Sequence, residues 1–110
     1  MKSTSLVAGA VLFLAAATIA SARSWDIAVD HTAQAGNMTV PSGDYTVRLK
    51  GTQATLTSED SGKSYDIPVK IVNVDRKYDE TAVVSIENNG TEVIESIELG
   101  GTATEIEFAR

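Results

Sequence analysis

Cysteine is absent from the 110-residue sequence, and histidine occurs once, as His31. The lack of cysteine excludes disulfides, thiol catalysis, Cys-ligated zinc and acylation of a lipoprotein cysteine. A small domain without disulfides must be stabilised by side-chain packing and by hydrogen bonds between strands. We therefore expect a single hydrophobic core and a mature protein without a lipid tether.

Recognisable catalytic and metal-binding sets are also missing. His31 lies in a Gly-containing segment, with no cysteine or second histidine to share a metal ion and no partners at triad spacing. We interpret it as a surface loop residue. The sequence therefore predicts a protein that is not an enzyme and that has no catalytic, cofactor-binding or metal-ligating residues.

Basic residues are few, with 9 Lys and Arg against 15 Asp and Glu. They are scattered singly apart from Arg76-Lys77. Both nucleic acid and anionic membrane surfaces are bound by clustered cations, so neither is an expected partner. We interpret the acidity as a solvated outer face that keeps the protein soluble.

The N-terminal segment has the pattern of a signal peptide. Lys2 is followed by an uninterrupted run of small and apolar residues from Leu6 to Ala20 and by the small-x-small site Ala20-Ser21-Ala22. The apolar run is shorter than the roughly 20 residues that span a bilayer. We expect cleavage before Arg23, no membrane insertion afterwards, and a secreted or periplasmic location. Residues 23–110 then form one domain, in which 8 basic residues face 15 acidic ones, for a net charge of −7.

From Trp25 onward, apolar residues recur mostly at every second position, which is the period of a strand with one buried face. Turn sequences separate these runs: Pro41-Ser42-Gly43-Asp44, Gly51-Thr52, Asn89-Gly90 and Gly100-Gly101. The pattern predicts an all-β fold. We expect a small antiparallel β-sandwich or barrel of about seven or eight short strands in a meander, preceded by a signal-peptide helix.

Four segments carry more specific expectations. The polar segment 31–37 is expected to be a loop. A change of apolar phase predicts a β-bulge near Ile71-Val72, and Pro68, which cannot donate to a ladder, predicts pairing on one side only at that point. Thr91 to Leu99 fits either a strand or one helical face. We favour the strand because nine residues make a marginal helix.

Acidic residues are the main candidates for a binding site. Glu59-Asp60 and the group of Asp75, Asp79 and Glu80 fall in two loops that could hold calcium, but their irregular spacing favours solvated turn residues. A second group could form an acidic stripe that recruits a basic partner, although most of its members are expected on the wet side of a sheet. This group consists of Glu92, Glu95, Glu98, Glu105 and Glu107, and an unbroken strand would place Glu92 and Glu98 on one face and Glu95 on the other.

Aromatic residues are few beyond the signal segment: Trp25, Tyr45, Tyr65, Tyr78 and Phe108. All but Tyr78 run in phase with aliphatic neighbours. We therefore expect them in the core and not as platforms for sugar binding.

The blocks P-S-G-D-Y-T-V, G-K-S-Y-D-I-P-V, K-Y-D-E-T-A-V-V and S-I-E-L-G-G-T-A-T-E-I-E-F run from Pro41 through Phe108. In these patterns the chain resembles the uncharacterised small secreted β-domain proteins of bacteria, a family with no assigned activity. The P-x-G-x-Y-x-V element of this chain also resembles the turn and strand of prealbumin-like sandwich modules. That resemblance implies a structural or binding role.

These features favour a secreted or periplasmic, non-catalytic domain that binds a protein or another envelope component. The first alternative is a barrel that carries a small apolar ligand in its interior. A hydrolase that uses an acidic pair is the last candidate.

Overall fold

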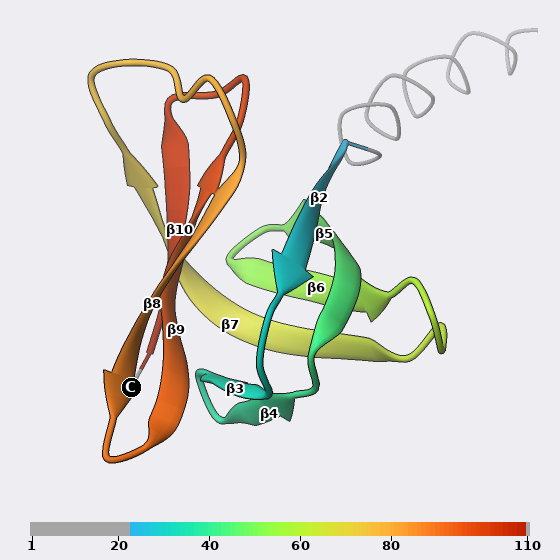
Figure 1. Ribbon diagram of the computed structural model, residues 1–110. Coiled ribbons are helices and arrows are strands. Elements are labelled where there is room, and N and C mark those ends of the chain that lie inside the picture. The colour runs from blue at the N-terminus through green and yellow to red at the C-terminus, as the bar shows by residue number, and fades with distance from the viewer. Residues whose placement is uncertain (1–22, 110) are drawn as a thin grey trace, which may run out of the picture.

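The computed structural model describes residues 23–109, which form an all-β structure (Figure 1). The predicted signal peptide, residues 1–22, lies outside the described residues. Within them, no helix has the length and hydrophobicity needed to cross a membrane. The predicted fold class is confirmed.

Nine strands make up the fold, and most begin and end at the turn sequences identified above. They are β2 (Ser24–Val29), β3 (Ala33–Ala35), β4 (Met38–Val40), β5 (Gly43–Lys50), β6 (Gln53–Ser58), β7 (Ser64–Asn73), β8 (Ala82–Asn88), β9 (Thr91–Leu99) and β10 (Thr104–Phe108). The expectation that 31–37 is entirely loop is wrong. Short β3 pairs with β4 on one side and, in parallel, with the start of β9 on the other.

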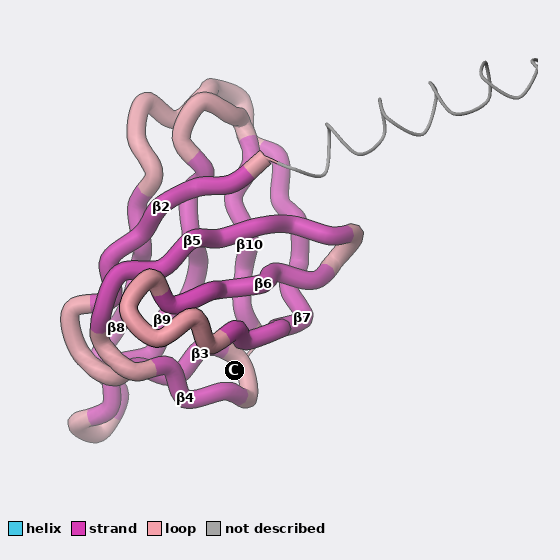
Figure 2. Tube along the Cα trace, turned by 90° about the vertical axis from the view of Figure 1, so that its right-hand side faces the viewer, coloured by secondary structure: helices cyan, strands magenta, loops and turns pink. Residues whose placement is uncertain are grey.

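The strands form one continuous sheet that folds at β7 into two layers. The first layer contains β2, β5, β6 and the start of β7, and the second contains the end of β7, β10, β9 and β8, with β3 and β4 beside β9. Figure 2 shows the strands of the first layer crossing those of the second steeply, as in orthogonal packing. The expected meander holds within β5–β6–β7 and β8–β9–β10, but β7 pairs with β10 and not with β8.

β7 belongs to both layers because its pairing partner changes along its length. Residues up to Pro68 pair with β6, whereas Val69 to Asn73 pair with β10. Pro68 is the last residue of the β6–β7 ladder, and the β7–β10 ladder begins only at Val69. The missing N–H of Pro68 therefore removes no hydrogen bond to β10. The prediction of one-sided pairing at Pro68 is confirmed.

The core lies between the two layers, and its members alternate along the strands as a strand period requires. The largest fully buried side chains come from both layers: Tyr45, Val47, Leu56 and Ile67 from the first, and Ile94, Ile97, Leu99 and Ile106 from the second. Tyr45 also donates a hydrogen bond of 2.6 Å from its hydroxyl to the Pro41 carbonyl, which gives the P-x-G-x-Y-x-V element a structural role. Burial of this phenol raises its pKa.

A β-bulge interrupts the β8–β9 ladder between Val84 and Ser85. On β9, Ser96 pairs with Val84 and Ile94 with Ser85, which leaves Glu95 as the extra residue. The bulge lets both Ile94 and Ile97 face the core, and it explains why this segment also fits a helical spacing. The strand prediction for Thr91–Leu99 is confirmed.

The expected bulge near Ile71-Val72 is wrong, because the β7–β10 register runs without a shift from Val69 to Asn73. The apolar side chain of Val72 is instead half-buried on the opposite face from Ile71.

The bulge at Glu95 in β9 also changes which way the acidic residues of this strand point. It reverses the phase of β9, so Glu92 faces the same way as buried Ile94, whereas Glu98 alternates with buried Ile97 and Leu99 and points outward. The expectation that Glu92 and Glu98 share a face is therefore wrong.

The two layers are tied together at one end of the molecule. The Trp25 indole N–H donates to the carbonyl of Gly100 at 3.1 Å, and the Gly100 N–H donates to Thr81 Oγ1 at 2.9 Å. Arg23 lies over the Trp25 ring, with its guanidinium carbon 5.1 Å from the ring centroid. The start of β2 and the start of β8 are thus held close to the Gly100-Gly101 turn.

Candidate functional site

The folded sheet does not close between β2 and β8. β2 pairs only with β5, and β8 pairs only with β9, so each presents an unpaired edge. Few contacts join these two strands, and a cavity of about 570 Å³ lies between them. We call this cavity the β2–β8 groove.

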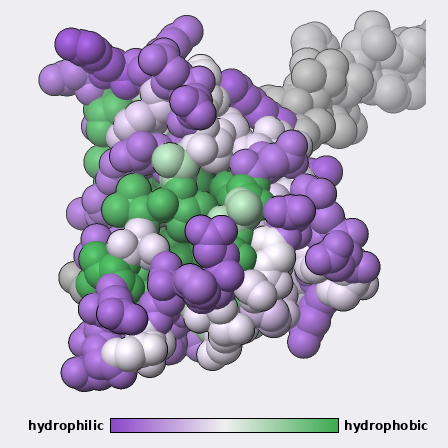
Figure 3. Space-filling view, viewed as in Figure 1, coloured by the Kyte–Doolittle hydropathy of each residue, from purple (hydrophilic) through white to green (hydrophobic). Residues whose placement is uncertain are grey.

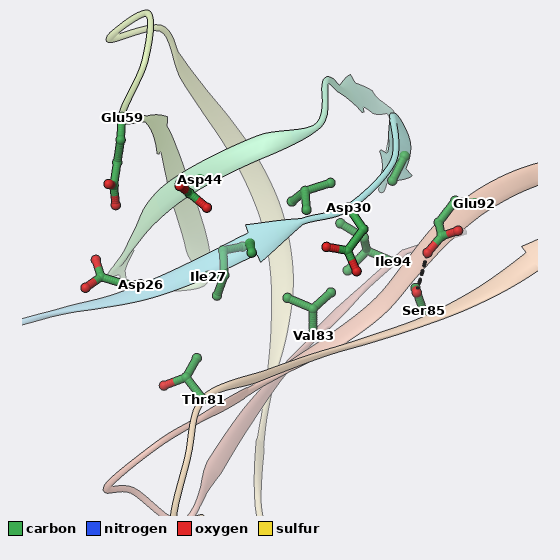
Figure 4. A pocket seen from close by; sticks show the side chains of 13 residues that line it. Asp26, Ile27, Asp30, Asp44, Glu59, Thr81, Val83, Ser85, Glu92 and Ile94 are labelled. Atoms are coloured by element: carbon green, nitrogen blue, oxygen red, sulfur yellow. Dashed lines mark hydrogen bonds between the residues drawn. The ribbon is translucent and has the colours of Figure 1, made fainter.

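The floor of the β2–β8 groove is apolar. Ile27 and Val29 of β2, Val83 of β8 and Ile94 of β9 line it, and Figure 4 shows Ile27 and Val83 projecting into the space between their strands. Figure 3 shows hydrophobic residues gathered on this face of the molecule, with hydrophilic residues around them. An extended segment could therefore find both unpaired backbone groups and apolar contacts here.

The border of the groove is acidic. Five carboxylates line it, and none of its lining residues, all within the described part of the chain, is Lys, Arg or His. They are Asp26, Asp30, Asp44, Glu59 and Glu92. Figure 4 shows Asp44 and Glu59 at one end of the groove and Asp30 and Glu92 at the other. Such a surface attracts cations through its summed field.

Glu92 differs from the other four carboxylates because it is half-buried, whereas they are exposed. The Ser85 hydroxyl donates to Glu92 Oε2 at 2.7 Å. The two side chains point the same way from neighbouring strands because the bulge has turned Glu92 toward the groove. A carboxylate held in this way presents its charge in a fixed position at the open end.

The other acidic groups lie apart from the groove or only at its margin. Glu59 lines it, whereas Asp60 lies beside Gly43 in the exposed 58–63 turn. Asp75, Asp79 and Glu80 are exposed in the 74–81 connection. Among the described residues, no three Asp, Glu or His side chains are arranged to hold a metal ion.

The predicted acidic stripe is divided by the bulge into two surfaces. Glu92 belongs to the β2–β8 groove, whereas Glu95, Glu105 and Glu107 border a separate shallow hollow beside Ser96 and Phe108. Glu98 and Glu105 are paired directly across β9 and β10. Sequence alternation alone could not find this division, because the position of a bulge depends on pairing between strands.

Tyr78 relieves part of the charge repulsion on the second surface. Its hydroxyl donates to Glu105 Oε1 at 2.9 Å. Desolvation of the phenol, this hydrogen bond and the nearby negative charges of Glu105 and Glu98 raise the pKa of Tyr78 to about 12. Its backbone also bonds Thr102 and Gly101, so Tyr78 fastens the 74–81 connection to the β9–β10 turn.

The remaining aromatic residues and His31 agree with expectation. Tyr45, Tyr65 and Phe108 are buried, and the Tyr45 and Tyr65 rings meet edge to face with centroids 6.3 Å apart. Trp25 is half-buried against the core, and His31 is exposed in the connection between β2 and β3. The expectations of aromatic residues in the core and of His31 at the surface are confirmed.

Comparison with protein-family models, with curated proteins and with solved structures gives no match to this chain. The groove itself is therefore the basis for a functional proposal.

Proposed function

We propose that this chain is an exported, non-catalytic binding domain that takes an extended protein segment into the β2–β8 groove by strand addition. The observation that carries the proposal is the pair of unpaired strand edges on either side of an apolar floor. An added strand would satisfy backbone N–H and C=O groups on these edges and would cover Ile27, Val83 and Ile94.

Other features of β8 support this use of its edge. Natural proteins commonly protect edge strands with lysine, proline or a covering loop. β8 contains neither lysine nor proline, and Val84, on its outer face, is 36 % exposed. The edge thus lacks these two common means of discouraging an additional strand.

We favour this function over a carrier of small apolar ligands because packed side chains occupy the interior between the layers. Eight or more large side chains from both layers are fully buried there, and the hollows found among the described residues are open to the surface. Acid-pair hydrolysis remains the weakest candidate. No feature of the groove supports it beyond the presence of carboxylates.

The proposal can be tested by selecting binders from a displayed library of random peptides and measuring their affinity for two variants. Val83→Ser removes an apolar contact from the groove, whereas Val84→Ser changes the adjacent residue on the opposite face of β8. We expect Val83→Ser to weaken binding about three- to tenfold, as loss of roughly 1 kcal/mol of apolar contact implies, and Val84→Ser to leave it unchanged.

The stability of both variants is measured in parallel by thermal unfolding, so that a loss of binding is read only from folded protein. Selected peptides that bind Val83→Ser and the unchanged protein equally well would contradict the proposal. So would a library that yields no binder at all.

A further inference from the structure

The floor of the β2–β8 groove is apolar and its border is acidic, and this difference specifies the kind of segment that the groove would bind. Building on the proposed function, we infer that the groove recognises a strand in which apolar residues alternate with Lys or Arg. The apolar residues would point into the groove, and the cationic residues would point out toward its acidic border.

The alternation follows from strand geometry. Successive side chains of a strand placed between β2 and β8 point to opposite faces of the sheet. The inner face meets Ile27, Val83 and Ile94, which are buried or half-buried. A charged side chain pointing inward beside these three residues would lose its hydration. The one inward-facing carboxylate that lines the groove, Glu92, lies at its end and already accepts a hydrogen bond from Ser85.

The outer face of the groove meets carboxylates. Asp26 alternates along β2 with inward-facing Ile27. Asp44, on β5, is paired with Ala28 of β2. Glu59 is joined to Asp44 by a backbone hydrogen bond of 2.9 Å, from the Glu59 N–H to the Asp44 carbonyl. These three exposed carboxylates follow the border of the first layer. The outward side chains of an added strand would therefore be near negative charge at several points.

The distribution of the carboxylates favours separate cationic side chains over one bound ion. They lie at both ends of the groove, and no three of the described acidic side chains converge as a metal site requires (Figure 4). A second copy of this chain is disfavoured as occupant by charge, since the sequence carries a net charge of −6 and its basic residues are scattered.

Three six-residue peptides, the length of β2, test the inference by their affinity for the purified protein. One alternates Val with Lys, one alternates Val with Glu, and one alternates Val with Thr. We expect the Val-Lys peptide to bind most tightly, and its affinity to fall as salt concentration rises. The Val-Glu peptide should not bind measurably.

Charge-neutralising variants locate the interaction. The triple variant Asp26→Asn, Asp44→Asn and Glu59→Gln should weaken binding of the Val-Lys peptide about tenfold, since each exposed ion pair contributes up to about a fivefold change in affinity. The matched control, Asp66→Asn, Asp75→Asn and Asp79→Asn, makes the same change in net charge at exposed positions outside the groove. It should have little effect at physiological salt.

The outcomes separate this inference from the proposed function. Equal affinity for the Val-Lys and Val-Thr peptides, with both sensitive to Val83→Ser, would overturn the cationic preference and leave strand addition supported. Equal weakening by the two triple variants would also overturn it, because the effect would then arise from net charge alone. Binding of none of the three peptides would contradict both proposals.

Discussion

At the scale of single residues, Gly100 shows how closely the β9–β10 turn approaches the segment that leads into β8. A Cβ atom added at Gly100 would lie 2.7 Å from the Thr81 backbone nitrogen and 2.8 Å from the Glu80 carbonyl carbon. Both atoms belong to the backbone and cannot move aside as a flexible side chain would. Glycine is therefore required at this position by close approach, although its φ is ordinary.

The substitution Gly100→Ala is expected to destabilise the fold by about 1–3 kcal/mol, the usual cost of overpacking. Chemical denaturation measures the change in the free energy of unfolding. Adding Thr81→Ala removes a third close atom, Thr81 Oγ1, but should not restore the loss, because the two closest contacts are with main-chain atoms of Thr81 and Glu80. A Gly100→Ala variant as stable as the unchanged protein would show that the turn does not approach the start of β8 this closely.

Tyr78 provides a second prediction at this scale. Its pKa is raised to about 12 from an ordinary value of 10.0, so the folded state favours the neutral phenol. The stability that this preference contributes is therefore complete below about pH 10 and is lost as the pH rises toward 12. Ultraviolet titration should show one tyrosine ionising near pH 12 that disappears in Tyr78→Phe.

The control for Tyr78 is Glu105→Gln, which removes a negative charge and weakens the hydrogen-bond acceptor. This variant should lower the pKa of Tyr78 toward its ordinary value. An unchanged titration in Glu105→Gln would contradict the contribution of Glu105 to the shift, which adds to that of desolvation.

At the scale of elements, local sequence patterns predicted most strands and turns. Strict alternation marked β5, and Asn89-Gly90 marked the β8–β9 turn, where the φ values of 53° and 82° are those that a primed hairpin turn needs. The bulge, the short strand β3 and the pairing of β7 with β10 escaped prediction. Each depends on contacts between segments distant in sequence, which alternation along one segment does not report.

Most of the candidate site could not be foreseen from the sequence, because it too depends on contacts between distant segments. The sequence indicated that Glu92 was one of several acidic residues, but its orientation depends on the bulge between it and Glu98. The groove depends on which two edges remain unpaired, and strand order was not predictable from the pattern. Asp26 gave no sequence signal beyond its place on the polar face of a strand, and Asp44 gave none beyond its place in the predicted Pro41-Ser42-Gly43-Asp44 turn.

The β9 bulge yields a prediction by deletion. Removing Glu95 leaves Ile94 and Ile97 two positions apart, so both can still face the core in a regular ladder. We expect this deletion to retain cooperative unfolding, with a loss within the about 0.5–3 kcal/mol typical of single substitutions. Deleting Glu98 instead removes the residue between buried Ile97 and Leu99 and should prevent stable folding. Similar stability of the two deletions would contradict the placement of the bulge.

At the scale of the whole molecule, the N-terminal segment is predicted to direct export, and the domain that follows it contains the folded core. Residues 1–22 carry the export pattern, and residues 23–109 contain the core. When the full chain is expressed in a bacterium with an intact export system, we expect the protein in the periplasm or medium to begin at Arg23. N-terminal sequencing checks this, and recovery of exported protein that retains Met1 would contradict the cleavage prediction.

The central claim is that the sheet is left unclosed between β2 and β8 and can accept one more strand there. Amide hydrogen exchange of the purified protein, with and without the alternating Val-Lys peptide, tests it most directly. The account predicts that amides within Ser24–Val29 and Ala82–Asn88 exchange faster than those of central β6 in the free protein and become protected when the peptide binds. Protection of a different pair of strands, or binding with no change in β2 and β8, would contradict it.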